Sequence, residues 1–481
     1  MKADALLTSL LDQRVRALNE RPADPRKPFV LLWLQGQRRV SQNLAFSHAQ
    51  RSANELGLPL VVYEGLRRDY PYASERLHRF VLEGVADTAD DCARRGVAYG
   101  FFLEQKDSPR GTLHALAARA ALVVTDWLPT FIHPAQTRRL AERCPVRLEA
   151  VDAAGVAPLA AFPAAEIGAR TLRPKLHRLL AEKLVEIPEP AAKIKPPSRF
   201  DWGFEPLTPP RTERALTQAV RAAAVDPSVG KVLHVTGGRS AGLAQLGRFL
   251  KSGLQGYAEA RNQPEAGKPS GLSSYLHFGQ VGSGEIALLA RQSGAPFEDK
   301  EAFLEELLVR RELSLNFCAR TPGYDKTSAL PAWAQRTLAE HEKDPRPALL
   351  TDADLDEART PDPLWNAAQR QLRAEGRIHG YLRMLWGKSM LNWSKNAAEA
   401  LRRMQWLNDR YALDGRDANS AVGFLWCLGL HDRPFPQRAI FGVVRSMTSG
   451  SAMKKFDLDG YLAKFGPAPS QQQSGGGKID L

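Results

Sequence analysis

The sequence predicts two domains of different class, an α/β domain with a doubly wound parallel sheet and then an all-α domain. Three observations predict this. Short apolar runs alternate with amphipathic stretches over 28–160, as in βαβ units. Proline clusters in 188–210, as in a semi-rigid linker. Helical periodicity then continues to about Phe465. We therefore expect an α/β domain over 1–187, a linker over 188–210, a helical domain over 211–466 and a disordered tail over 467–481.

Five apolar runs rich in Val, Leu and Phe are expected to form the parallel sheet, because strands buried on both faces need no polar alternation. Amphipathic segments at 41–56 and 76–96 lie between them and are expected to be covering helices. Neither GxGxxG nor GxxxxGK[ST] follows a strand, so no dinucleotide or P-loop site is predicted. The expected strands are 28–34, 58–66, 97–104, 121–127 and 146–152.

The balance of charge indicates a polyanionic partner. The chain of 481 residues has a formal net charge of +13 and a pI near 9.6. Nucleic acid is the first candidate and an acidic membrane surface the second. The simpler interpretation is that the charge only confers solubility.

Cysteine usage and hydropathy bound the location. The four cysteines form neither a CxxC pair nor a disulfide framework, so we expect reduced thiols, no metal site and a cytoplasmic protein. Acidic residues interrupt the first apolar stretch, which makes it a poor signal peptide. No window approaches 18 uninterrupted apolar residues, so no membrane span is expected.

Five tryptophans crowd the stretch from Trp365 to Trp426. Trp386 and Trp393 are seven residues apart, so on a helix both rings lie on one face, roughly 10 Å apart along the axis. That spacing suits a relay of oxidisable rings. Tryptophans at helical spacing are more often core filler, and spacing alone leaves both interpretations open.

A serine-rich loop precedes a short helical pattern at SGLSSYLHFG, 270–279. Hydroxyls and free backbone N–H groups at a helix start can bind a pyrophosphate. An ordinary N-cap is the alternative, because Ser is a common capping residue.

Two further segments mix charge with apolar residues. EELLVRREL, 305–313, is by composition best explained as a surface helix with i,i+4 pairs. RPFPQRAIFGVVR, 433–445, interleaves arginines with phenylalanines, which suits a nucleic-acid backbone with bases stacked nearby. A solvated helix face explains the second pattern equally well.

In this order the motifs resemble the DNA photolyase/cryptochrome superfamily, most closely its class II cyclobutane pyrimidine dimer photolyases, from about Pro28 to Phe465. RRVSQNLAFSHAQ resembles the first helix of the family and SGLSSYLHFGQVG its flavin-phosphate loop. EELLVRRELSLNFC resembles its substrate-side helix. The most specific matches are WNAAQRQLRAEGRIHGYLRMLWGKSMLNW, LNDRYALDGRDAN and GFLWCLGLHDRPFPQRAIFGVVRSM.

The resemblance implies a light-driven DNA repair enzyme. The helical domain would hold FAD, active as FADH⁻, and the α/β domain would hold an antenna chromophore of deazaflavin or folate type. The partner would be UV-damaged DNA, duplex or single-stranded, with the dimer flipped out, and the enzyme would be a monomer. Electron transfer from the excited cofactor would split the cyclobutane ring, and the electron would then return.

The resemblance also assigns roles to residues at the flavin. Asn408 would face flavin N5, and Arg383 and Asp414 would form an ion pair beside the ring, whose cationic side offsets the flavin anion. Trp386 and Trp365 would pass electrons to oxidised flavin, with Trp393 on a branch. The FAD-binding set is completed by Tyr257, Ser270, Gly271, Leu272, Ser273, Ser274 and Asp417.

On the substrate side, Glu306 would hydrogen-bond the pyrimidine edge and stabilise its developing negative charge. Arg310 stands where many photolyases have a tryptophan that stacks on the dimer, and a guanidinium can also stack on a base. The dimer pocket would be lined by Tyr381, Met384 and Trp426, and phosphates would be bound by Arg261, Arg438 and Arg445.

Three alternatives to repair stay open at this point. One is a cryptochrome-like photoreceptor that lacks repair activity, although Glu306 and a tail of only about 15 residues favour repair. Another is a helical DNA-binding scaffold without a cofactor, which would be colourless. The third is an iron–sulfur relative, which four dispersed cysteines disfavour.

Overall fold

The computed structural model describes residues 2–265 and 269–467, and the chain divides into two compact units. Unit 1 comprises 1–256, 270–322 and 413–419, and unit 2 comprises 257–269, 323–412 and 420–481. Unit 1 thus includes segments from beyond the predicted linker, and the domain bounds drawn from the sequence stay a prediction. The predicted tail lies outside the described residues, apart from Pro467.

The core of unit 1 is a six-stranded sheet of order β1-β6-β5-β2-β3-β4. All five predicted strands are confirmed and run parallel. The sequence missed the three-residue edge strand β1, which pairs antiparallel with β6. The strands are β1 (Val15–Ala17), β2 (Val30–Leu34), β3 (Leu60–Leu66), β4 (Ala98–Leu103), β5 (Leu122–Asp126) and β6 (Leu148–Val151).

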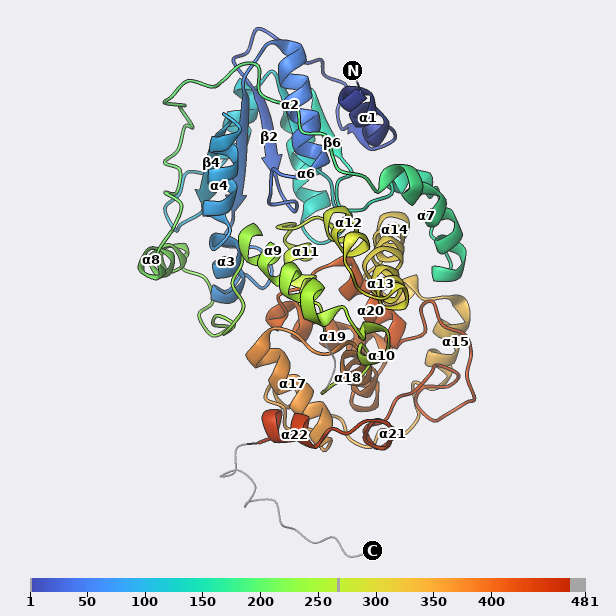
Figure 1. Ribbon diagram of the computed structural model, residues 1–481. Coiled ribbons are helices and arrows are strands. Elements are labelled where there is room, and N and C mark those ends of the chain that lie inside the picture. The colour runs from blue at the N-terminus through green and yellow to red at the C-terminus, as the bar shows by residue number, and fades with distance from the viewer. Residues whose placement is uncertain (1, 266–268, 468–481) are drawn as a thin grey trace, which may run out of the picture. The chain divides into compact units, whose positions relative to one another are not determined.

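Helices cover both faces of this sheet (Figure 1). Along β2, Leu32 faces a core shared with α1 and α2, whereas Leu31 and Trp33 face a core shared with α5 and α6. Because both faces are buried, the strand shows no polar alternation. These helices are α1 (Lys2–Leu11), α2 (Leu44–Leu56), α3 (Glu75–Leu82), α4 (Val85–Arg94), α5 (Thr112–Arg119) and α6 (His133–Arg143).

The segment 76–96, expected as one helix, is divided at Gly84 into α3 and α4. A Cβ on Gly84 would lie 3.0 Å from the Cα of Gly238. The side chain of Glu83 accepts the N–H of Gly237 at 2.5 Å. The break therefore lets a distant loop approach the helix backbone.

The rest of unit 1 is helical. It has two π-helical turns, one that ends α9 and one between α13 and α14, and such turns are often found at functional sites. The elements are α7 (Ala169–Lys183), α8 (Glu213–Ala223), α9 (Arg239–Arg248), the π-turn η2 (Phe249–Gly253), α11 (Ser273–His277), α12 (Ser283–Gln292), α13 (Phe297–Leu304), the π-turn η3 (Glu305–Arg310) and α14 (Arg311–Arg320), with a 3₁₀ turn η1 at Leu159–Ala161.

Unit 2 is built from helices. Part of the Gly/Ser-rich segment 442–456 is a helix, α21, in which Thr448 is the N-cap and accepts the N–H of Ser451. The elements are α10 (Tyr257–Ala260), the 3₁₀ turn η4 (Thr327–Ala329), α15 (Ala332–Glu340), α16 (Asp352–Asp356), α17 (Pro363–Glu375), α18 (Gly380–Trp393), α19 (Ala397–Tyr411), α20 (Ala418–Cys427, whose first two residues belong to unit 1), α21 (Ser449–Lys455) and α22 (Asp459–Phe465).

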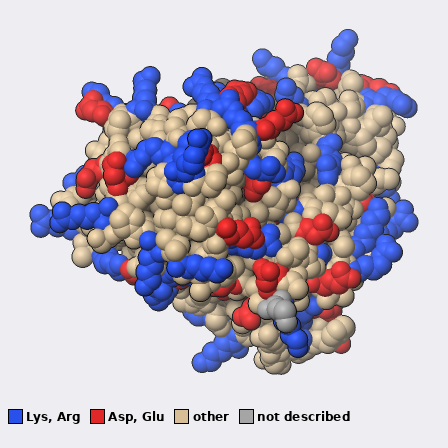
Figure 2. All heavy atoms as spheres, turned by 90° about the horizontal axis from the view of Figure 1, so that it is seen from above, with Lys and Arg blue, Asp and Glu red and all other residues tan. Residues whose placement is uncertain are grey.

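The structure shows how charged residues, cysteines and apolar helices are distributed. Figure 2 shows a face on which Lys and Arg are interspersed with Asp and Glu, so this face carries no single basic patch. The four cysteines are buried free thiols. Among the helices of the described residues, none is both long enough and apolar enough to cross a membrane.

Candidate functional site

The tryptophans of unit 2 form a contiguous chain. The rings of Trp365 and Trp386 are stacked, with centroids 6.1 Å apart and planes 6° from parallel. Trp393 meets Trp365 edge-on at 5.4 Å. Trp365 and Trp386 are fully buried, and Trp393 is 5% exposed. The order of contact is therefore Trp386, Trp365, Trp393, and we call these three residues the triad.

Local structure explains the position of Trp365. Asp362 accepts the N–H groups of Leu364 and Trp365 and so caps α17, with Pro363 at the first helical position. Trp365 and Gln369 are one turn apart on the same face of α17. The indole N–H of Trp365 donates to the carbonyl of Trp386 at 2.9 Å, and that of Trp386 donates to Gln369 Oε1 at 3.0 Å.

Asn408 lies on α19 in unit 2 and is fully buried. Its amide nitrogen donates to Ser420 Oγ at 3.3 Å and to Asp409 Oδ1 at 3.2 Å. Among the described residues, no donor reaches its amide oxygen. Buried acceptors are rarely left unpaired, so this oxygen fits a ligand that offers an N–H. Reduced flavin has such a group at N5.

The serine loop of unit 1 is built around Gly271. Its φ is +69°, and a Cβ there would lie 2.9 Å from Gln245 Nε2, which binds the Ser270 carbonyl. Leu272 and Ser274 are buried, and Ser273 begins α11. The loop is therefore preorganised, and Ser270 Oγ accepts the N–H of Leu272 at 3.4 Å. Its binding of a phosphate stays a prediction.

Asp417 closes the far end of α11. Its carboxylate lies 3.4 Å from His277 Nδ1 and 3.8 Å from Arg311 Nη1, and it accepts the N–H of Asn419. Burial alone would raise the pKa of Asp417, but these partners hold it well below its usual range. The carboxylate thus braces α11, and its part in holding FAD stays a prediction.

The remaining flavin residues fall in both units. Tyr257 begins α10 and is buried, and Arg383 lies half-buried on α18, both in unit 2. Asp414 belongs to unit 1. The ion pair expected between Arg383 and Asp414 stays a prediction.

Glu306 and Arg310 lie on the π-turn η3 of unit 1 rather than on a regular helix. Glu306 is exposed. The neighbouring Glu305 lies 2.7 Å from Arg173 and 3.6 Å from Arg310. The interpretation of this segment as a plain i,i+4 surface helix is therefore wrong.

The expected pocket residues of unit 2 lie on two helices, Tyr381 and Met384 on α18 and Trp426 on α20. The backbone carbonyl of Met384 accepts from the thiol of Cys427, the neighbour of the half-buried Trp426. Tyr381 packs edge-on against Phe456 at 4.6 Å.

The carbonyl of Arg261 accepts from His379 Nε2 at 3.0 Å, which ties the backbone at Arg261 to the N-cap of α18. His379 in turn accepts the N–H of Tyr381.

The segment 433–445 is a loop, so its interpretation as a helix face is wrong. The guanidinium groups of Arg433 and Arg445 lie 5.7 and 5.5 Å from the ring centroid of Phe435. Arg438 is exposed, and its N–H bonds Gly442 O in a tight turn. Two exposed arginines beside one aromatic ring, with the exposed Arg438 on the same loop, suit a phosphate backbone. Lys388 Nζ anchors the loop by donating to the Arg445 carbonyl at 2.7 Å.

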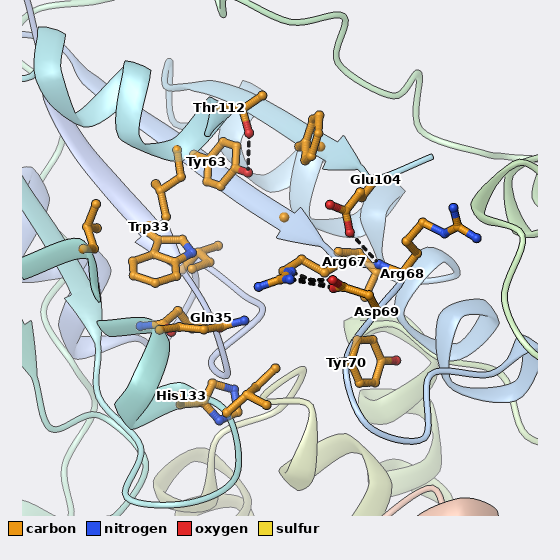
Figure 3. A pocket seen from close by; sticks show the side chains of 18 of the residues that line it. Trp33, Gln35, Tyr63, Arg67, Arg68, Asp69, Tyr70, Glu104, Thr112 and His133 are labelled. Atoms are coloured by element: carbon orange, nitrogen blue, oxygen red, sulfur yellow. Dashed lines mark hydrogen bonds and ion pairs between the residues drawn. The ribbon is translucent and has the colours of Figure 1, made fainter. Parts of the chain in front are cut away.

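Unit 1 contains a cavity of about 880 Å³ that the sequence did not reveal. It opens at the carboxyl ends of β2, β3 and β4, which is where doubly wound folds bind ligands. Trp33, Gln35 and His133 lie along one side, and Arg67 and Tyr70 along the other (Figure 3). Its basic residues are Arg38, Arg67, Arg68, Lys106, Arg110, Arg139, Arg143 and Arg416, and its acidic residues are Asp69 and Glu104.

Some titratable groups of the cavity wall are neutral or paired. Burial lowers the pKa of His133 to about 4 and raises that of Tyr63 and of Tyr70 to about 12. Arg67 pairs with Asp69 at 2.7 Å. The excess of basic residues and the aromatic walls suit a planar, anionic ligand.

Fold and site together define a protein with an α/β sheet domain, a helical domain and a buried tryptophan chain. Comparison with known proteins names the class. A family model described as DNA photolyase matches residues 30–192. A protein named deoxyribodipyrimidine photo-lyase from Methanothermobacter thermautotrophicus is 37% identical, over 94% of this chain and 98% of its own length. One of the same name from Potorous tridactylus is 35% identical over 95% and 85%. The chain belongs to the DNA photolyase family.

Solved structures agree on the fold. A Synechocystis cryptochrome matches with a TM-score of 0.69 at 15% identity, covering 91% of this chain and 88% of its own. An archaeal photolyase from Sulfolobus tokodaii, solved with two FAD molecules, matches with a TM-score of 0.62 at 16% identity, covering 91% and 89%. Photolyase and cryptochrome thus share this fold, and the fold alone does not separate repair from signalling.

Proposed function

We propose that the chain is a class II cyclobutane pyrimidine dimer photolyase, acting as a monomer in the cytoplasm on UV-damaged DNA. The observation that carries the proposal is the match, over nearly the full length of both chains, to relatives named for photo-lyase activity. The cryptochrome-like alternative rests on fold likeness at only 15% identity. Light-dependent DNA repair is therefore the activity we assign.

The residues that fit FAD have separate roles. The loop 270–274 would bind the phosphates, and the unpaired oxygen of Asn408 would accept the N5–H of the reduced ring. When bound, the reduced flavin supplies the light-driven electron that splits the dimer and takes it back afterwards. The triad would reload that electron when the flavin is oxidised.

Glu306 is assigned to the dimer. Its carboxyl on η3 would hydrogen-bond the pyrimidine edge and, in its acid form, donate the O–H to the carbonyl oxygen where negative charge develops as the electron arrives. Arg310, four residues later, would stack on the base in place of a tryptophan. Tyr381, Met384 and Trp426 would line the pocket, with phosphates bound at Arg261, Arg438 and Arg445.

The cavity of unit 1 is proposed as the antenna site. Eight basic residues against two acidic ones select an anionic ligand, and Trp33 and Tyr63 offer flat faces to an aromatic one. A deazaflavin and a folate both meet these terms. Pigment extraction and mass spectrometry on the purified protein would name it.

The test of function is direct illumination of the reduced protein with an oligonucleotide that carries one thymine dimer. We expect thymines to be restored in the light and not in the dark. Glu306→Ala should keep FAD and DNA binding but lower repair per absorbed photon by roughly tenfold or more. Glu301→Ala, an exposed acid on α13, is the matched control. Normal DNA binding without restored thymines would favour the photoreceptor alternative.

A further inference from the structure

The indole of Trp386 is held by one specific partner, the side chain of Gln369. Both side chains are fully buried, and the Trp386 Nε1–H donates to Gln369 Oε1 at 3.0 Å. An indole can only donate a hydrogen bond, so the amide must present its oxygen. Gln369 Nε2 faces the carbonyl of Asp356 at 3.4 Å, which fixes the same orientation of the amide.

Oxidation changes the acidity of these N–H groups. An indole that has lost one electron is a radical cation, and its N–H is far more acidic than that of neutral indole. Whether the proton leaves depends on the basicity of the partner. Trp386 faces an amide oxygen and Trp365 a backbone carbonyl, and neither is basic enough to take a proton.

Trp393 differs from the other two members of the triad. Its Nε1 has no hydrogen-bond partner among the described residues and is not sealed from solvent. Within the triad its ring contacts Trp365 and forms no ring pair with Trp386. Water can therefore take the proton here, at the end most remote from Trp386.

We propose that Gln369 is a positioning residue that keeps the oxidised Trp386 protonated, so that proton loss is confined to Trp393. This rests on the proposed reloading of flavin through the triad. One electron leaves Trp386 for the light-excited flavin, which is reduced. Trp365 returns one electron to Trp386, and Trp393 returns one to Trp365. The Trp393 radical then gives its Nε1 proton to water, and an external thiol later supplies the missing electron and water the proton.

A protonated Trp386 radical lets the positive charge move away from the flavin toward Trp393. If Trp386 lost its proton first, the neutral radical would have no positive charge left to pass on, and the oxidising equivalent would stay beside the flavin and recombine. A carboxylate at position 369 would create that fault. Gln369→Glu should therefore lower the yield of lasting photoreduction several-fold.

The test confines the radical to Trp386 with Trp365→Phe in the FAD-bound protein. Flash photolysis distinguishes the protonated from the neutral indole radical by absorption. We expect the protonated form, with no change of decay in D₂O. Adding Gln369→Glu should give the neutral form with a D₂O effect, in spectra recorded up to about pH 9, where a carboxyl is normally ionised. The matched control is Gln371→Glu, on the same helix but bonded to Tyr461.

Three outcomes would overturn the proposal. They are a neutral radical in Trp365→Phe alone, a radical that stays protonated with Gln369→Glu across the pH range, and an unmoved Trp386 indole N–H signal in Gln369→Leu. The last is read by NMR of ¹⁵N-tryptophan protein in the dark, with the signal assigned by Trp386→Phe. Unchanged photoreduction in Trp386→Phe would instead disprove the relay itself.

Discussion

Two regions of this molecule use aromatic side chains in opposite surroundings. Two rings of the triad in unit 2, Trp365 and Trp386, are sealed from solvent, and their N–H groups meet only neutral oxygens. The cavity of unit 1 also has aromatic walls, but basic residues surround them. A fixed ion beside the triad would trap a moving charge, because Coulomb interactions are strong in a dry interior. A cavity that holds an anion needs the opposite environment.

The largest expected effect is the loss of the triad. Trp386→Phe should lower photoreduction of oxidised FAD by at least about tenfold, because the first electron donor is removed. Repair should be spared once the flavin is reduced chemically. Photoreduction is followed by steady-state absorption under blue light with a thiol reductant. Repair is followed by the thymine-dimer assay. Normal photoreduction in the variant would show that the triad does not carry electrons to the oxidised FAD.

A buried carboxyl in unit 1 gives the second effect. Glu312 is 2% exposed, and its Oε1 accepts the N–H of Val156. Burial raises its pKa from about 4.5 to about 7. Above about pH 4.5 the carboxyl ionises in the unfolded chain but stays protonated in the folded one. The folded state is therefore most stable below about pH 4.5 and loses at most about 3 kcal/mol as the pH rises through 7. Glu312→Gln should therefore gain stability relative to the native chain between about pH 5 and pH 8.5.

Urea unfolding at the two pH values measures this change. Glu305→Gln is the control, because Glu305 pairs with Arg173 and its pKa is lowered by that hydrogen bond. Its contribution is fully present above about pH 4.5 and is lost only as the pH falls further, so Glu305→Gln should show almost no change between pH 5 and pH 8.5. Parallel trends in the two variants would contradict the charge assignments.

These features differ in how visible they are in the sequence. The strands could be predicted because a buried parallel strand is a continuous apolar run, whereas β1 has three residues and no pattern. The seven-residue spacing placed Trp386 and Trp393 on one face. It could not show that Trp365, on another helix, contacts both.

Tertiary contacts and topology account for the features that the sequence missed. Gln369 was missed because an amide one turn from a tryptophan carries no signal of its own. The cavity draws residues from many elements, and they converge only through sheet topology. The rule that ligands bind at the carboxyl ends of parallel strands was the one available signal.

The third effect tests the basic residues of the cavity in unit 1. Arg139 lines the cavity, and Arg138 beside it does not. Arg139→Glu should reduce bound antenna pigment several-fold, because one favourable charge contact becomes a repulsion near an anionic ligand. Arg138→Glu makes the same charge change and should leave the pigment content as it is. Pigment and FAD are quantified together after denaturation, and equal loss in both variants would mean that net charge alone matters.

The smallest effect concerns DNA. Arg438 is exposed on the loop 433–445, so its contact with a phosphate should be worth about 1 kcal/mol and release about one counterion. Arg438→Gln should make the plot of log affinity against log salt less steep by about 0.9. Arg214→Gln, an exposed arginine on α8, removes the same charge elsewhere. Fluorescence anisotropy with a dimer-containing duplex over a salt series gives both slopes. If the two slopes fall equally, the loop 433–445 does not contact the DNA phosphates specifically, and the net charge of +13 accounts for the affinity.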